Sequence, residues 1–147
     1  MGPPRPAGRV LGLDLGDVRI GVAVSDPERR VALPFGTVHV GRPPGELLAI
    51  AALVAEHEVT FVVLGLPLSM SGERGPRARL AAGFAEALRA VLTVPVEFQD
   101  ERLSTVEAER SLREAGIKGR DRRGVVDAAA AQVILQAWLD AHPSPAG

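Results

Sequence analysis

The first apolar run of the chain is Val10-Leu11-Gly12-Leu13-Asp14-Leu15-Gly16 (VLGLDLG), and one carboxylate lies in the middle of it. Burying an isolated ionised acid among aliphatic side chains is strongly unfavourable, so chains tolerate it where the charge is paired, hydrogen-bonded or bound to a metal ion. The aliphatic content predicts a buried strand over residues 9–15, and Gly16 predicts a tight turn after it. Because residues 19–25 follow after a very short loop, we expect the two segments to form a β-hairpin.

Two further acidic positions occur later in the chain. Asp100 and Glu101 close another apolar run, and Asp127 opens an alanine-rich segment. Carboxylates at strand and helix ends, in a chain without cysteine and with scattered histidines, favour a hard cation such as Mg²⁺ or Mn²⁺. Side chains alternate along a strand, so Asp100 and Glu101 cannot both face Asp14, and we expect Glu101 to be the ligand, with Asp100 as the alternative. The pattern predicts a metal-dependent phosphodiesterase.

Each acid also has a purely structural interpretation. Asp14 would then cap the hairpin turn, the acidic pair would form a solvated turn before a helix, and Asp127 would stabilise the first turn of its helix through the helix dipole. The residues after Asp127 favour the functional interpretation, because Ala128 to Ala131 are small enough for the helix to lie close to a sheet. That packing would bring Asp127 towards the end of the first strand.

The remaining pattern predicts one α/β domain with a mixed five-stranded sheet flanked by helices. Pro34 and Gly36 indicate an edge strand or a bulge, and the unbroken apolar run 60–66 is typical of a strand covered on both faces. We expect a flexible leader (1–8), the domain (9–141) and a tail (142–147). The expected strands cover 9–15, 19–25, 31–40, 60–66 and 94–99, and the expected helices cover 44–58, 76–92, a segment opened by a capping box at Ser104 and Glu107, and 125–141 after a basic loop at 116–124.

Composition excludes several classes of protein. The 147 residues are 46% hydrophobic and 24% charged, as in an ordinary globular domain. The chain lacks an apolar run near the roughly 18 residues that a membrane span needs, and its first residues lack the apolar core of a secretory signal. Absence of cysteine excludes disulfide and thiol chemistry and fits the cytoplasm.

Arginine dominates the basic residues, although the net charge is only −1. Of the 17 basic side chains one is a lysine, Lys118. Arginine suits bidentate contacts with phosphate. A codon bias explains the use of arginine instead of lysine equally well. The clustering of the arginines along the chain is the observation that favours contact with nucleic acid. The candidate contacts in these clusters are Arg74, Arg77, Lys118, Arg120, Arg122 and Arg123.

Four motifs, in order along residues 9–141, resemble the YqgF/RuvX family. The first is Gly12 to Gly16 with Arg19 to Asp26, and the second is Val63 to Leu68 with Gly72 and Gly75-Pro76. The third is Asp100 to Thr105, and the fourth is Val126-Asp127 with Ala130-Ala131 and Ile134 to Gln136.

The resemblance implies an RNase H-like fold related to the RuvC resolvases. It also implies a cytoplasmic nuclease, dependent on Mg²⁺ or Mn²⁺, that acts in maturation of the 16S rRNA 5′ end, with Holliday-junction resolution as the older assignment. By this resemblance Asp14, Asp127 and Glu101 (or Asp100) take the catalytic positions, and Arg19 and Arg102 join the candidate nucleic-acid contacts. The implied partners are precursor rRNA, with branched DNA as the alternative, and ribosomal precursor particles; no membrane is implied, and monomer and homodimer both stay open.

Two other functions compete with the nuclease. An Asp-x-Gly motif followed by a hairpin also cradles ATP phosphates in sugar kinases and related ATPases, but those proteins need a second, similar half, and this chain has one such motif. A non-catalytic ribosome-assembly module with the same fold is the other alternative. Metal-dependent cleavage that disappears in Asp14→Asn distinguishes the nuclease from both.

Overall fold

The computed structural model describes residues 8–16, 18–41, 45–66, 75–100 and 120–143, with the backbone alone for 120–126. The loop expected at 67–74 and the helix expected after Ser104 lie outside the described residues. Elsewhere the predicted strands and helices are confirmed with small changes at their ends. The elements are β1 (Arg9–Leu15), β2 (Arg19–Ser25), β3 (Ala32–His39), α1 (Gly45–Glu56), β4 (Val59–Leu66), α2 (Pro76–Val91), β5 (Val96–Asp100) and α4 (Arg120–Ala141).

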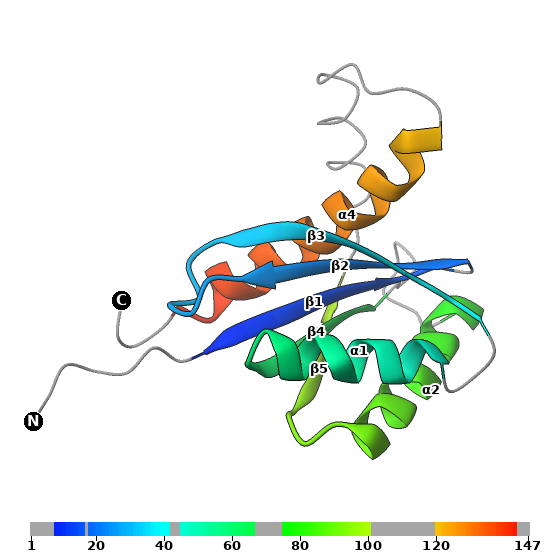
Figure 1. The fold of residues 1–147 in the computed structure, drawn as a ribbon, viewed down its shortest axis with the longest axis horizontal. Helices are drawn as coiled ribbons and strands as arrows, with labels where there is room; N and C mark the ends of the chain where they lie inside the picture. The colour runs from blue at the N-terminus through cyan, green and yellow to red at the C-terminus, as the bar shows by residue number, and fades with distance from the viewer. Residues whose placement is uncertain (1–7, 17, 42–44, 67–74, 101–119, 144–147) are drawn as a thin grey trace, which may run out of the picture.

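The strands form one mixed sheet in the order β3-β2-β1-β4-β5 (Figure 1). The first three strands pair antiparallel, as hairpins require, whereas β4 pairs parallel with both β1 and β5. Gly16 closes the β1–β2 hairpin by donating its N–H to the carbonyl oxygen of Arg19 at 3.0 Å. The predicted hairpin and mixed sheet are therefore confirmed. The parallel pairing places the carboxyl ends of β1, β4 and β5 at the same edge of the sheet.

The edge strand β3 is irregular where the sequence predicts it. Its pairing with β2 shifts between Val22 and Ala23, which face Gly36 and Pro34, so that Phe35 is left outside the register. Proline cannot donate to the ladder and is found at edges and bulges. The predicted edge and bulge are confirmed.

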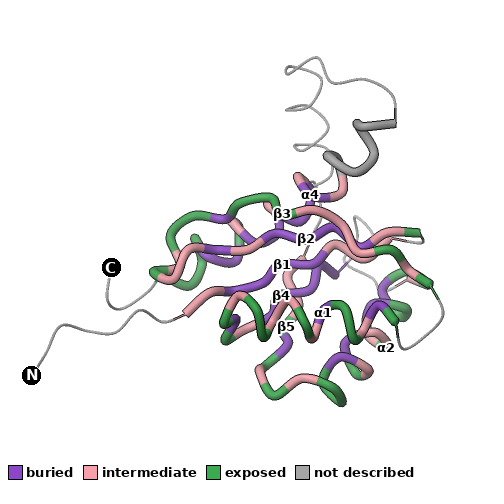
Figure 2. The backbone as a smooth tube through the Cα atoms, viewed as in Figure 1, coloured by how far each residue is buried: buried purple, intermediate pink, exposed green. Residues whose placement is uncertain are grey.

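Helices cover both faces of the sheet. In Figure 1, α1 and α2 lie on one face and α4 lies on the other. Leu11 and Leu13 of β1 belong to the apolar cluster beneath α1 and α2, whereas Val10 belongs to the cluster beneath α4. The buried positions follow the sheet and the inner side of each helix in Figure 2. Strand alternation therefore assigns each β1 residue to one face of the sheet. Asp14 is four residues after Val10, so the two lie on the same face, the one that α4 covers.

The last helix begins earlier than the sequence predicts. α4 begins at Arg120 rather than Val125, so residues 120–124 of the expected basic loop are helical, and residues 116–119 lie outside the described residues. Arginine is a good helix former, and Gly124 inside a helix costs only about 1 kcal/mol, which the packing of α4 on the sheet offsets. Asp127 is consequently well inside the helix, so its expected position in the first turn is wrong, and with it the structural alternative that it stabilises that turn. Although α4 has 22 residues, no helix in the described part of the chain is long and apolar enough to cross a membrane.

Candidate metal and nucleic-acid site

Asp14 lies near the carboxyl end of β1, half-buried, on the face that α4 covers. Its register partner on β2 is Gly21. Residues that face each other across an antiparallel pair project to the same side of the sheet. The side of Gly21 that would carry a Cβ therefore faces the same way as the Asp14 side chain, towards α4.

Glycine at position 21 allows α4 to touch the sheet directly. A Cβ built on Gly21 would overlap the backbone carbonyl oxygen of Asp127, and its nearest neighbours would all be backbone atoms of that residue. Further along α4, a Cβ at Gly12 would lie 2.7 Å from the Cβ of Leu135. These two close approaches seat the helix, and they place the backbone of Asp127 over Gly21, the register partner of Asp14. The alanines after Asp127 predict such an approach, and Ala128, Ala130 and Ala131 are buried.

Arg19 connects the hairpin to the helix. Its Nε donates to Oδ2 of Asp127 at 2.8 Å, and the two side chains are 26% and 27% exposed. Arg19 precedes Gly21 by two residues, so strand alternation points it to the same face. Arg19 was predicted to contact nucleic acid, and this ion pair was not predicted, because the partners are 108 residues apart. The contact holds one carboxylate oxygen of Asp127 and compensates its charge.

The end of β5 separates the two candidates for the third acid. Asp100 pairs with Leu66, and Phe98 with Leu64, and these leucines belong to the cluster beneath α1 and α2. Parallel partners share a face, so the register assigns Asp100 to the face opposite Asp14. Glu101 lies outside the described residues, and its role as a ligand stays a prediction.

The candidate basic contacts fall partly within the described chain. Arg77, in the first turn of α2, directs Nη2 towards the carbonyl oxygen of Leu15 at 3.5 Å, next to the end of β1. Arg120, Arg122 and Arg123 lie in the first turns of α4, ahead of Asp127, and only their backbone is described. Arg74, Arg102 and Lys118 lie outside the described residues.

The donor set fits a hard divalent cation without completing a site. Asp14 and Asp127 supply carboxylate oxygens from two elements, which is the ligand type that Mg²⁺ and Mn²⁺ prefer. Within the described ranges no group of three acidic or histidine side chains is close enough to hold a metal ion. A third ligand from the segment after Asp100 would complete the set. Trp138, predicted to be core rather than a stacking platform, is 4% exposed between Ile134 and Leu139, so that prediction is confirmed.

Comparisons with known proteins match nearly the whole chain. A family model described as "RuvX: Holliday junction resolvase" matches residues 8–141. A protein of Anaeromyxobacter dehalogenans (strain 2CP-C) named "Putative pre-16S rRNA nuclease" is 56% identical over 132 residues, which cover 90% of this chain and 96% of the relative. A protein of Myxococcus xanthus (strain DK1622) with the same name is 53% identical over 137 residues, covering 93% and 91%.

Solved structures share the fold at low identity. RuvC of T. thermophilus, solved in complex with a Holliday junction substrate, superposes with a TM-score of 0.53 at 18% identity, covering 90% of this chain and 94% of that one. The resolvase of Fowlpox virus, solved with Holliday junction DNA, gives a TM-score of 0.56 at 9% identity, covering 90% and 97%. The predicted RNase H-like fold is thereby confirmed.

Proposed function

The chain belongs to the RuvX family, and we propose on that premise that it is a nuclease that hydrolyses phosphodiester bonds of precursor 16S rRNA with the help of a divalent cation. The observation that supports this function best is the close approach of α4 to Gly21, because Gly21 meets the backbone of Asp127 and is also the register partner of Asp14. Arg19 pairs with only one carboxylate oxygen of Asp127, and carboxylate oxygens contributed by separate elements are the usual ligands of a divalent cation. The hard-cation preference of carboxylates makes Mg²⁺ or Mn²⁺ the ion of choice.

We assign three acids to the cation: Asp14, Asp127 and Glu101. Asp100 is the weaker candidate, because the register of β5 with β4 assigns it to the opposite face of the sheet. A bound divalent cation stabilises negative charge on the phosphate oxygens and activates water for attack. The chain's own contribution is to hold the carboxylates in place, with α4 fixed by its contact with Gly21 and Asp127 fixed by Arg19.

The basic residues around this edge of the sheet would hold the nucleic-acid backbone. Arg77 lies at the end of β1, and Arg120, Arg122 and Arg123 belong to the helix that supplies Asp127. Phosphate contacts of this kind fix the register of a bound strand without reading its sequence. We assign the remaining candidates, Arg74, Arg102 and Lys118, to the same task. A precursor rRNA substrate, free or in a ribosomal precursor particle, makes the cytoplasm the expected location.

Resolution of a Holliday junction is the second candidate. The family model carries that description, and two structures with the same fold were solved with junction DNA. The catalytic acids would be the same, since both reactions hydrolyse a phosphodiester. The two functions differ in the substrate that the surrounding surface accepts.

The deciding experiment offers three labelled substrates side by side, with Mg²⁺ or Mn²⁺: a single-stranded RNA, a precursor 16S rRNA and a four-way DNA junction. Wild type is compared with Asp14→Asn, which removes a charge without removing volume, and with Asp26→Asn as a matched control at the far end of the same hairpin. We expect cleavage of the precursor rRNA by wild type and the control, and none by Asp14→Asn.

The other outcomes are equally informative. Cleavage of the junction alone would favour the resolvase. Intact binding without cleavage of any substrate would contradict the nuclease and favour a non-catalytic assembly factor. Cleavage that persists in Asp14→Asn would show that the carboxylate assignment is wrong.

A further inference from the structure

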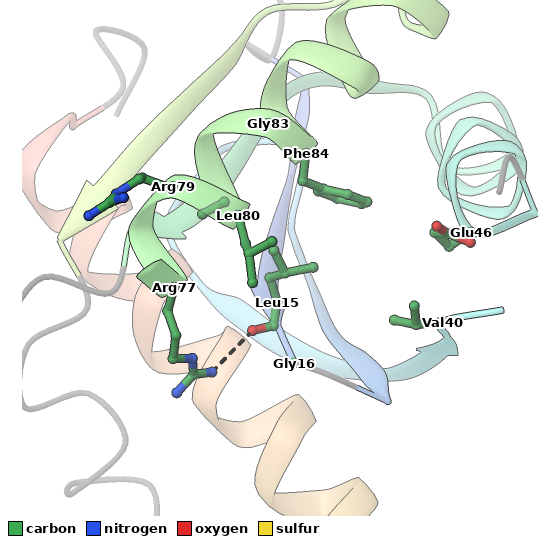
Figure 3. Close-up of a pocket in the computed structure, with 10 residues that line it drawn as sticks. Leu15, Gly16, Val40, Glu46, Arg77, Arg79, Leu80, Gly83 and Phe84 are labelled. Carbon is green, nitrogen blue, oxygen red and sulfur yellow. Dashed lines mark hydrogen bonds between the residues drawn. The ribbon is translucent and has the colours of Figure 1, made fainter. Parts of the chain in front are cut away.

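A cavity lies on the other face of the sheet, opposite the acids. It has a volume of about 460 Å³ and opens between the ends of β1 and β3 and the first turns of α1 and α2 (Figure 3). This size is within the range of about 300–1,000 Å³ typical of small-molecule sites. Its wall is mainly apolar, and the aliphatic and aromatic side chains that supply it are Leu15, Val40, Leu80 and Phe84.

One buried carboxylate lines this apolar cavity. Glu46, in the first turn of α1, is only 8% exposed, and its Oε2 is buried without a hydrogen-bond donor from the described part of the chain. Buried carboxylate oxygens are normally matched by donors, because an unmatched one loses its hydration without compensation. In Figure 3 the carboxylate of Glu46 lies across the cavity from Phe84 and Leu15. A ligand in the cavity would therefore meet an acceptor on one side and apolar surface on the other.

The mouth of the cavity has the opposite charge. Arg77 lines it and lies beside the end of β1, with its Nη2 3.5 Å from the carbonyl oxygen of Leu15 (Figure 3). Arg79 also contributes to the lining, but in Figure 3 its guanidinium points away from Glu46 and Phe84. Arg77 disfavours a cationic ligand and favours one that carries a phosphate at this edge of the cavity. The ligand thus needs an apolar body, hydrogen-bond donors that face Glu46 and a phosphate near Arg77.

We propose that this cavity binds a guanine base of the RNA substrate, with Glu46 accepting hydrogen bonds from its Watson–Crick edge. Among the common bases guanine presents two adjacent donors there, the ring N1–H and the exocyclic amino group, which one carboxylate can accept together. Adenine, cytosine and uracil do not present this pair. Enzymes that bind an extruded base read it in this way, by hydrogen bonds to that edge and by packing against aromatic or apolar side chains.

The position of the cavity connects it to the proposed nuclease site, on which this inference rests for its substrate. Leu15 lines the cavity, and its neighbour Asp14 faces the other side of the sheet. A strand that crosses the carboxyl edge of β1 would place a base on one side and a phosphodiester on the other. Arg77, at this edge, lies where the phosphate of the bound nucleotide would pass. The cavity would thereby select a guanosine close to the cleaved bond.

Binding of free nucleotides tests the inference without cleavage. Guanosine, inosine, adenosine, cytidine and uridine monophosphates are titrated into the ¹⁵N-labelled protein without divalent cation, and amide shifts are followed. Inosine lacks the exocyclic amino group, so we expect the affinity to be highest for guanosine monophosphate, lower for inosine monophosphate and lowest for the other three. We expect guanosine to bind at least about tenfold more tightly than adenosine, the discrimination typical of a bidentate base contact. Shifts should be largest at Leu15, Glu46 and Phe84.

Two variants link the preference to the cavity. Glu46→Gln keeps the volume and should reduce guanosine affinity by about tenfold, whereas Glu56→Gln, at the exposed end of the same helix, should leave it unchanged. Gly83 lines the cavity, and a Cβ there meets nothing within 4 Å. Gly83→Leu should fold and weaken the binding of all the nucleotides, which gives a second test if Glu46→Gln is unstable.

Several results would overturn the inference. One is equal affinity for the guanosine and adenosine monophosphates, and another is guanosine binding that is unchanged in Glu46→Gln. A third is tighter binding of arginine amide than of guanosine monophosphate, which would identify the cavity as a site for a cationic side chain. Cleavage of RNAs that differ in one guanosine then separates the two proposals. Cleavage that does not depend on the guanosine, together with equal binding of all the nucleotides, would refute the assignment of the cavity but not the proposed nuclease activity. Selective guanosine binding by a protein that cleaves nothing would refute the nuclease alone.

Discussion

Two aspartates of the same three-stranded segment have different surroundings. Asp26, in the turn after β2, accepts hydrogen bonds at Oδ1 from the backbone N–H groups of Arg30 and Val31, both at 2.8 Å. Its partners are thus within five residues along the chain. Asp14, near the opposite end of the hairpin, faces a helix that begins more than a hundred residues later. The surroundings of Asp26 are thus local in the sequence, whereas those of Asp14 depend on how a distant helix packs on the sheet.

The pKa of Asp26 is consistent with a structural role. Burial raises the pKa of this carboxyl, but the backbone N–H groups of Val31 and Arg30 and a contact with Glu28 together outweigh it, and the pKa falls below its ordinary value of 3.8. Hydrogen bonds donated to the charged form favour that form. Asp26 therefore stays ionised under all ordinary conditions and holds the turn between β2 and β3.

The comparison predicts its largest effect at Asp127. We expect Asp127→Asn to fold normally and to lose cleavage by at least about 100-fold, more than the 10–100-fold typical of a group that only supports a metal ligand. The cleavage assay described above measures the loss, and circular dichroism reports the fold. Asp140→Asn, an exposed position of the same helix, is the control and should be unaffected. Full activity in Asp127→Asn would place the chemistry elsewhere.

The next largest effect is expected at the contact between β2 and α4. Gly21→Ala should destabilise the protein by about 1–3 kcal/mol, the usual cost of overpacking, because the new methyl group would overlap the carbonyl oxygen of Asp127. Cleavage should fall as well, since Asp127 would move. Urea unfolding measures the difference. Gly36→Ala, where a Cβ meets nothing within 4 Å, should change the stability little, and equal effects of the two substitutions would refute this account of the contact.

Asp26→Asn should have a smaller effect, on stability alone. The amide keeps the shape but loses the charge, so we expect a cost of about 0.5–1.5 kcal/mol at neutral pH. Because the folded pKa of Asp26 lies below the unfolded one, its stabilisation is fully present above the unfolded value of 3.8 and is lost as the pH falls through the folded value. Unfolding of wild type and variant between about pH 7 and pH 3 should show the difference shrink below about pH 4. A difference that stays constant with pH would contradict the charge-based explanation.

The smallest effect is expected for the ion pair between Arg19 and Asp127. Both side chains are about a quarter exposed. A double-mutant cycle with Arg19→Gln and Asp127→Asn, measured as the free energy of unfolding in urea, should therefore give a coupling energy of about 0.2–1 kcal/mol. The coupling should weaken as salt is added, because exposed charges are screened. Coupling of several kcal/mol, or none of the salt dependence, would mean that the pair is more deeply buried than the structure describes.

Sequence patterns located most elements because their causes are local. β1 and β2 have the predicted ends, Arg9–Leu15 and Arg19–Ser25, since aliphatic content and the turn at Gly16 specify a hairpin without outside help. The start of α4 was placed five residues too late. Gly124 and the surrounding arginines indicate a loop by themselves, whereas the helix that packs on the sheet through Ala131 to Leu139 begins at Arg120.

The candidate site divides in the same way. The sequence marked Asp14 and Asp127 as unusual, and the alanines after Asp127 indicated a close helix. It did not reveal the pairing of Arg19 with Asp127, which depends on contacts between residues 108 apart. Glu46 also passed unnoticed, because a glutamate in the first turn of a helix is ordinary until the tertiary structure buries it.

By itself the sequence determined the order of strands and helices, the type of residue available for chemistry and the resemblance to a nuclease family, because these depend on periodicity, turn residues and side-chain type. The tertiary structure decided which residues share a face of the sheet. Strand register assigned Asp14 to the α4 side and Asp100 to the other, and the absence of a side chain at Gly21 set how closely α4 approaches. The physical reason is that a site joins groups whose separation along the chain is long, and only packing fixes their separation in space.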